Sequence, residues 1–255
     1  MASRTTGGRG SAIGPLTARV VAGRYEVGGL RLHEALFDLY DALDRRLNTS
    51  IGFRAALGQV IARRPLVDRL QQIFRALRTF NHPNVVEIHD CFQEVSQTYV
   101  TQEYVQGPSL AEWVDIRGDQ RFTPVESLSV AIVLCQALAA GHAAGIVHGG
   151  ISPDGVRFAE PIRDLDLREP ITLKASRLFL GGKAITPKFM NYGLGPVEAG
   201  ISSTRKSYGL HAPKLDEFLP PEQQAGLSPE PRSDFYSLAC LIHYCVTGRP
   251  PEGAS

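Results

Sequence analysis

The hydrophobic pattern of the chain changes near residue 107, and this change constrains the fold more than any other feature. Upstream, short apolar runs separated by glycine, proline and polar connections such as residues 41–48 predict strands, with one helix over residues 66–80. Downstream, apolar residues recur every three or four positions, most clearly over residues 127–145 and 233–247. The pattern therefore predicts a small, mostly β part followed by a mostly helical part.

Composition narrows the classes of function. Of the 255 residues, 43% are hydrophobic and 21% are charged, which is ordinary for a globular protein. The net charge of +1 argues against a nucleic-acid partner. No run reaches the ~18 apolar residues of a membrane-spanning helix, so we expect no membrane segment in this chain, with an anchor in a longer parent chain left open. The four cysteines form no C-x-x-C pair, which favours reduced thiols and a cytoplasmic location.

Three regions are expected along the chain. Residues 1–22 begin with a glycine-rich, basic and polar stretch and predict a flexible leader. Residues 23–106 predict a small lobe, and residues 107–255 predict a helical lobe. A cleft between two lobes is a favoured place for a ligand.

Five stretches of sequence point to a family. They are HPNVV at residues 82–86, YVTQEYVQGPSL at 99–110, GIVHGGISPDGV at 145–156, PPE at 220–222, and RSDFYSL at 232–238 with TGRPP at 247–251. In this order and spacing they resemble the protein kinase family, and its bacterial serine/threonine type most. The resemblance implies a bilobal α+β fold with a mostly β N-lobe and a mostly helical C-lobe. The family's C-lobe continues beyond the helix that resembles residues 233–247, so the resemblance also implies that the C-lobe is incomplete here.

The resemblance assigns roles to several residues. Four hinge residues would hold a nucleotide: Gln102, Glu103, Tyr104 and Val105. Three residues would be structural: His148, Asp234 and Glu222. A polar stretch ahead of Glu222 offers possible phosphorylation sites for a partner kinase: Ser202, Ser203, Thr204, Ser207 and Tyr208.

The charged groups that phosphoryl transfer requires in this family are replaced in the N-lobe. Lysine is absent from the first 173 residues, and Arg54 stands where the resemblance requires a phosphate-binding lysine. Arg54 is either a phosphate-facing cation or a surface arginine that lies along apolar neighbours. The position of the glutamate that holds this lysine falls on Ile73. The counterpart of the glycine-rich loop, residues 32–40, has no glycine and contains Glu34.

The C-lobe positions are replaced as well. Gly150 stands in place of the base aspartate and Gly155 in place of a metal-binding asparagine, while Asp154 comes one residue early. The metal-binding turn resembles residues 191–193, which places Asn191 where the family has an aspartate. An alternative register uses residues 175–177, and either register lacks a carboxylate. An insertion near residues 159–188 is implied, because the spacing exceeds that of the family.

These replacements predict a pseudokinase, a kinase-like domain with no catalytic residues and no metal site, which acts as a protein-binding and regulatory module in phospho-signalling. No cofactor is expected, although ATP without magnesium stays open. The expected partners are proteins, such as an active kinase or a reader of phosphorylated segments. Two alternatives are an atypical serine/threonine kinase that uses Arg54 and Asp154 in altered geometry, and a scaffold that senses ATP.

Overall fold

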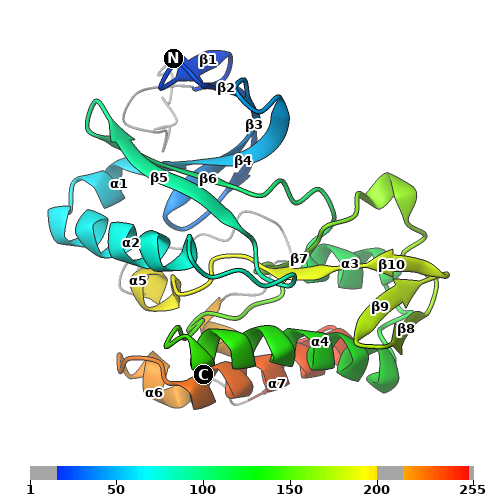
Figure 1. Ribbon diagram of the computed structural model, residues 1–255. Coiled ribbons are helices and arrows are strands. Elements are labelled where there is room, and N and C mark those ends of the chain that lie inside the picture. The colour runs from blue at the N-terminus through cyan, green and yellow to red at the C-terminus, as the bar shows by residue number, and fades with distance from the viewer. Residues whose placement is uncertain (1–15, 200–214, 253–255) are drawn as a thin grey trace, which may run out of the picture. The chain divides into compact units, whose positions relative to one another are not determined.

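The computed structural model describes residues 16–199 and 215–252, which fold into two compact units (Figure 1). The first unit holds the described residues up to Phe74 together with Ile88–Tyr104. The second unit holds Arg75–Glu87 and the described residues from Val105 onward. The first unit ends at Tyr104, two residues before the predicted boundary after residue 106. Residues 75–87 differ from the expectation, because they group with the second unit.

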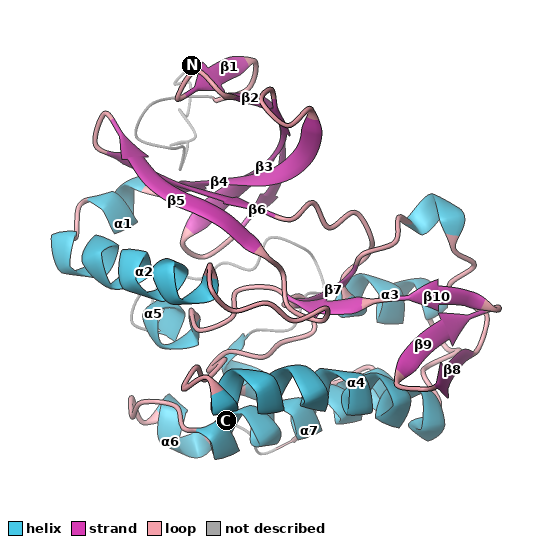
Figure 2. Cartoon of the chain, viewed as in Figure 1, coloured by secondary structure: helices cyan, strands magenta, loops and turns pink. Residues whose placement is uncertain are grey.

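The first unit is built on an antiparallel sheet of six strands in the order β1-β2-β3-β4-β6-β5 (Figure 2). Its strands are β1 (Arg19–Val21), β2 (Tyr25–His33), β3 (Phe37–Asp44), β4 (Thr49–Ala56), β5 (Ile88–Glu94) and β6 (Gln97–Gln102). Two helices follow β4: α1 (Gly58–Ile61) and α2 (Arg64–Leu77), whose last turn contains the division between the units. A cluster of aromatic rings, with centroids of contacting pairs 5.2–6.5 Å apart, packs in the core of this unit: Tyr25, Phe53, Phe92 and Tyr99.

The leader expected over residues 1–22 is wrong at its C-terminal end. Leu16 and Val21 are buried, and β1 pairs with β2 in the register Arg19↔Val27. A three-residue strand carries too little alternation to be recognised in the sequence, and here burial of two side chains in the core of the first unit decides its structure.

The second unit is mostly helical. Its helices are α3 (Leu110–Arg117), α4 (Pro124–Ala143), α5 (Gly195–Ala199), α6 (Pro221–Gln224) and α7 (Pro231–Thr247), with short 3₁₀ turns η1 (Ile162–Asp164) and η3 (Leu215–Phe218). α4 and α7 lie side by side (Figure 1). The Phe122 N–H donates to the Cys245 carbonyl at one end of the pair, and His142 meets Asp234 at the other, so the two helices are antiparallel. The predicted α+β class is confirmed.

Residues 75–87 join the second unit through backbone pairing with β11 (Pro187–Phe189), which itself pairs with β7 (Val156–Phe158). The Val86 N–H donates to the Phe189 carbonyl at 3.0 Å, and the Phe189 N–H donates to the Asn84 carbonyl at 2.8 Å. The Asn84 side chain also donates to the Pro187 carbonyl at 2.8 Å. The HPNVV stretch thus serves as an extra strand-like segment beside β11.

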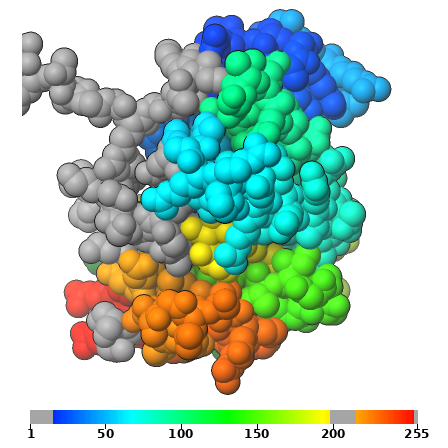
Figure 3. All heavy atoms as spheres, turned by 90° about the vertical axis from the view of Figure 1, so that its left-hand side faces the viewer, coloured from blue at the N-terminus to red at the C-terminus, as the bar shows by residue number. Residues whose placement is uncertain are grey.

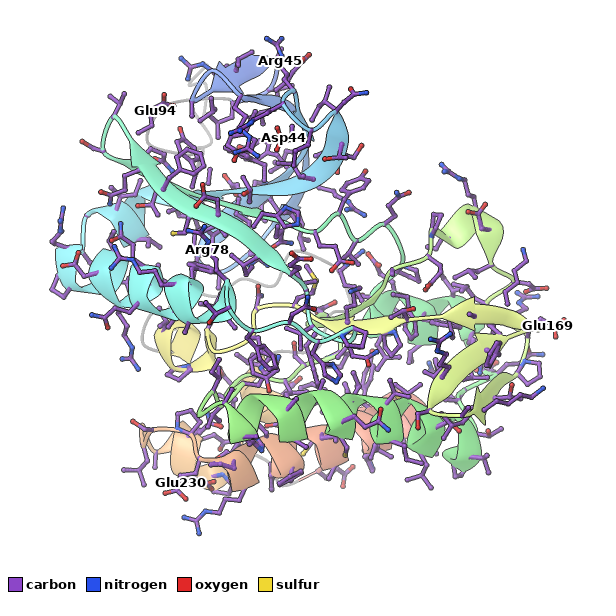
Figure 4. All side chains as sticks on the ribbon, in the orientation of Figure 1. Asp44, Arg45, Arg78, Glu94, Glu169 and Glu230 are labelled. Atoms are coloured by element: carbon purple, nitrogen blue, oxygen red, sulfur yellow. The ribbon has the colours of Figure 1, made fainter. Side chains whose placement is uncertain are left out.

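Within residues 159–188, where the sequence predicts an insertion, lies a separate three-stranded sheet of β8 (Ile171–Lys174), β9 (Arg177–Leu180) and β10 (Lys183–Ile185). Arg117 of α3 links the segment that leads into this sheet to α4. Its guanidinium donates to the carbonyls of Leu167 at 2.7 Å and Glu169 at 2.6 Å, and to Glu126 Oε1 at 2.9 Å. Glu169 marks the outer end of this sheet in Figure 4.

Glu126 completes this buried network. The Ile171 N–H donates to its Oε1 at 2.9 Å, and Thr123 at the N-terminus of α4 donates to its Oε2. Burial alone would raise the pKa of Glu126, but these donors and the Arg117 guanidinium outweigh burial and lower it. The carboxylate is therefore charged and fully bonded.

Among the described residues, one helix is long and apolar enough to cross a membrane by length and composition, namely α4. More than half of its most apolar window (56%) is buried inside the structure, and a core helix passes the same test.

Replacing Arg117 with methionine tests the role of the buried ion pair. We expect the free energy of unfolding to fall by about 3–5 kcal/mol, because Glu126 would keep a buried charge without its cation. Urea denaturation followed by circular dichroism measures the change. Arg163→Met is the matched control, because that side chain is 79% exposed and its loss should cost less than about 0.5 kcal/mol. Equal stability of the two variants would contradict this role.

Candidate functional site

Asp234 organises the stretch that resembles the kinase catalytic loop. Its side chain is buried in the first turn of α7. Its Oδ2 accepts a hydrogen bond from the His148 backbone N–H at 2.9 Å, and its Oδ1 accepts one from the Gly149 N–H at 2.8 Å. His142 Nε2 lies 2.7 Å from Oδ2. These contacts and the positive end of the α7 dipole stabilise the buried carboxylate, which holds the loop backbone in place.

His148 is enclosed by other side chains. It is 0% exposed, and burial lowers its pKa to about 4, although the charge of Asp234 acts in the opposite direction. Its Nδ1 accepts from the Gly150 N–H at 3.3 Å. The rings of Phe189 and Tyr192 lie with their centroids 4.8 Å from the imidazole. A neutral, enclosed imidazole supports packing and cannot reach a substrate.

Gly150 has no room for a side chain. A Cβ added there would lie 2.8 Å from the Cα of Gly195, the first residue of α5, and 3.8 Å from Leu215 Cδ2. A Cβ added to Gly195 would overlap the Gly149 carbonyl. The start of α5 is thus packed backbone to backbone on the loop. Gly150 offers no group that could accept a proton.

The structure places residues 191–193, and not residues 175–177, next to the catalytic-loop stretch. Residues 191–193 follow β11, and the Met190 N–H donates to the Gly155 carbonyl at 2.8 Å. Ala175 and Ser176 instead form the turn between β8 and β9, with φ of 46° and 60°. Asn191 adopts a φ of 48°, which suits the short polar side chain of asparagine.

Tyr192 is the best anchored side chain of this turn. Its hydroxyl donates to the Ala137 carbonyl of α4 at 3.4 Å, and its ring packs on Phe80 with centroids 5.8 Å apart. A Cβ on Gly141 would overlap the tyrosine hydroxyl, so this glycine makes the notch in α4 that receives it. Burial raises the pKa of Tyr192, which is therefore a neutral hydrogen-bond donor.

Two carboxylates of the second unit have partners outside the loop. Glu222 in α6 accepts a hydrogen bond from the Ser233 hydroxyl at 3.1 Å, which ties α6 to the start of α7. Both segments lie in the orange part of the surface in Figure 3. The Ser109 hydroxyl, which caps α3, donates to Asp154 at 3.5 Å.

Arg54 lies in β4 and is 1% exposed. It is therefore not the surface arginine that the sequence allowed. Its Nη2 donates to Glu34 Oε1 at 2.8 Å, and its guanidinium lies 5.9 Å from the centroid of the Phe37 ring. The Glu34 side chain is also mostly enclosed, with 7% of it exposed. The cation is thus held by a carboxylate of the same unit.

Glu34 comes from the turn between β2 and β3, the counterpart of the glycine-rich loop. The Glu34 N–H donates to the Phe37 carbonyl at 2.8 Å, and the Leu57 N–H donates to the Leu36 carbonyl at 3.0 Å. Leu36 and Phe37 are both buried, and Phe37 packs edge-on against Phe74 of α2. The turn is therefore packed into the core of the first unit. Ile73, the neighbour of Phe74, is half-buried and brings no charge.

The predicted hinge lies where the chain passes from the first unit to the second. Gln102 ends β6 and is buried against Gly52, where an added Cβ would lie 2.9 Å from its Cγ. Glu103 and Tyr104 are half-buried, and the Arg31 guanidinium of β2 lies 5.1 Å from the centroid of the Tyr104 ring. Val105 is buried in the second unit.

The possible phosphorylation sites lie outside the described residues: Ser202, Ser203, Thr204, Ser207 and Tyr208. Within the described residues, no group of three or more histidine, cysteine, aspartate or glutamate side chains is arranged to hold a metal ion.

Comparison with known proteins identifies relatives of this chain. No protein-family model matches it. A protein named as a probable serine/threonine-protein kinase of Streptomyces coelicolor is 28% identical over 240 residues, which cover 91% of this chain and 31% of the relative. The serine/threonine-protein kinase PknB of Mycobacterium leprae is 24% identical over 232 residues, covering 89% of this chain and 33% of PknB.

The solved structures agree with these relatives on the fold. The crystal structure of the Mycobacterium tuberculosis PknI kinase domain matches with a TM-score of 0.69 and 19% identity, over 94% of this chain and 81% of that domain. The chain therefore has a kinase-like fold, and its relatives are bacterial serine/threonine protein kinases. It spans about a third of the length of the curated relatives it matches.

Three residues that shape the site were not predicted in these roles: Gly141, Gly195 and Glu34 as the partner of Arg54. Each works by contact with a segment far along the chain. Tyr192 is the one signal in the sequence for Gly141, because a buried tyrosine hydroxyl needs both space and a polar partner. The sequence alone does not say which helix provides them.

Replacing Gly150 with alanine tests the backbone packing of α5 on the loop. We expect a loss of about 1–3 kcal/mol in the free energy of unfolding, because the new Cβ would push Gly195 away. Gly29→Ala is the control, since nothing lies within 4 Å of a Cβ at that position. Thermal and urea unfolding measure both variants. A Gly150→Ala protein as stable as the control would show that α5 does not pack on the loop.

Proposed function

We propose that this chain is a pseudokinase: a kinase-like domain that regulates phospho-signalling by binding other proteins and does not transfer phosphate. The observation that carries the proposal is the contact between Gly150 and Gly195. It leaves neither a carboxylate nor the space for one at the position of the family's base. Phosphoryl transfer in this family needs that base together with a lysine and metal ligands.

The other replaced positions support the same function. Arg54 is bonded to Glu34, and its planar fork differs in shape and reach from the ammonium of a lysine. Asn191 and Gly155 stand at the positions of metal ligands. A neutral amide and a residue with no side chain are poor substitutes for the oxygen ligands of magnesium.

An active but atypical kinase is the competing function, because the relatives are named as kinases. Such an enzyme would rely on Arg54 and Asp154. The first is bonded to Glu34 and the second accepts from Ser109, so both would have to leave these partners. This weighs against the competing function.

A protein partner is supported by an apolar stripe on α4. Val125, Leu128 and Ile132 recur at helical spacing and are 72%, 52% and 47% exposed. Exposed apolar side chains on one helical face are typical of protein-binding surfaces. The partners that fit the proposal are an active kinase or a reader of phosphorylated segments.

A phosphotransfer assay tests the proposal. The chain is incubated with γ-labelled ATP, magnesium or manganese, and generic protein substrates, beside an active bacterial serine/threonine kinase as positive control. We expect no transfer to substrate or to the chain itself. Transfer that persists in an Arg54→Met, Asp154→Asn double variant would point to a contaminating kinase. Transfer by the original chain that this double variant loses would contradict the proposal.

A further inference from the structure

Arg54 and Glu34 form an unusual pair, because a buried cation on a sheet strand is neutralised by a turn residue 20 positions away. β4 lies between β3 and β6, with Arg54 opposite Leu39 on one side and Val100 on the other. A buried guanidinium in such surroundings is costly unless an anion accompanies it. The nearby Phe37 ring lowers the local dielectric further and strengthens the pair.

Packing of the turn fixes the position of the Glu34 carboxylate. Its backbone is held by the hydrogen bonds of Glu34 with Phe37 and of Leu57 with Leu36. On the strand side, His33 Nδ1 lies 2.6 Å from Asp38 Oδ1, directly across the two strands that the turn connects. No glycine occurs between Gly29 and Gly52, so the turn lacks the backbone freedom that glycine would give.

We propose that Arg54 is the cation of an anion-binding site, and that the Glu34 carboxylate occupies this site and blocks it. A guanidinium fork binds carboxylate and phosphate oxygens with similar geometry, so the two compete for the same donors. In the unaltered chain the Glu34 carboxylate binds Arg54 in preference to an oxyanion from solution, because it belongs to the same chain and its effective concentration is high. Removing its charge opens the site to a phosphate-type oxyanion. This inference concerns ligand control and holds whether or not the chain transfers phosphate.

Glu34→Gln tests the proposal, because it keeps the size of the side chain and removes its charge. The thermal midpoint is measured in phosphate and in chloride at equal ionic strength and pH. We expect Glu34→Gln to be less stable than the unaltered chain in chloride and to gain several degrees in phosphate. Glu26→Gln is the matched control: Glu26 also pairs with an arginine of this sheet region, Arg45, but that pair is half exposed.

General effects of phosphate on protein stability appear equally in the unaltered chain and in Glu26→Gln, so only the excess gain of Glu34→Gln counts. The same thermal midpoints are then measured with magnesium-free ATP in place of phosphate, and again with adenosine. A gain with phosphate and ATP alike assigns the site to the phosphate group alone. A gain with ATP that exceeds both phosphate and adenosine assigns it to a nucleotide.

A double variant, Glu34→Met with Arg54→Met, keeps the test decisive if Glu34→Gln folds poorly. It removes both charges and should fold without responding to phosphate, since an apolar pair often replaces a buried ion pair without loss. Phosphate should then restore folding of the single variant Glu34→Gln and leave the double variant unchanged. A Glu34→Gln protein that gains no more from phosphate than the controls, or that stays unfolded in phosphate while the double variant folds, would overturn the proposal.

Discussion

The buried carboxylate of Asp234 is the interaction on which the rest of the second unit depends. A charge in this position must be satisfied, and its partners are two backbone N–H groups of the loop and the ring of His142. These bonds hold the loop backbone against the first turn of α7. Once the loop is fixed, His148 meets Phe189 and Tyr192, and the strands on either side of the loop pair as β7 and β11.

This arrangement explains how the kinase-like architecture can be held without the groups that phosphoryl transfer requires. The contacts that hold the loop use backbone groups, aromatic rings and one carboxylate, and none of them requires a base or a metal. Gly150 and Gly195 then allow α5 to approach the loop more closely than any side chain would permit. In the first unit, Glu34 satisfies the cation that replaces the lysine, so the sheet can bury Arg54 without a bound nucleotide.

Much of the fold could be predicted from the sequence, because long periodic segments carry a strong signal. The helix predicted over residues 127–145 is α4 (Pro124–Ala143), and that over residues 233–247 is α7 (Pro231–Thr247). The sequence misleads at β1, where two apolar side chains are buried, and at β3, where a polar residue is buried by a partner. The pattern predicts a connection over residues 41–48, yet β3 continues to Asp44. Arg24 donates to the Asp44 carboxylate at 2.6–3.1 Å, which allows Asp44 to be buried.

For the candidate site, too, one part could be predicted from the sequence and another could not. Which positions are replaced could be read from the sequence, since each lies in a recognisable stretch. What the replacements contact could not be read, because the contacts join segments that are distant along the chain. Arg54 with Glu34 and Tyr192 with Gly141 are examples, and both depend on packing that sequence patterns do not encode.

Thermal unfolding of the unaltered chain with ATP, in the presence and absence of magnesium, tests the central claim most directly. A ligand at 100 times its dissociation constant stabilises a protein by roughly 2.7 kcal/mol, which moves the midpoint by several degrees. The proposed loss of magnesium ligands predicts that magnesium adds nothing to any effect of ATP. A shift that requires magnesium would contradict the account, because it would mean that the described residues still assemble a metal–nucleotide site.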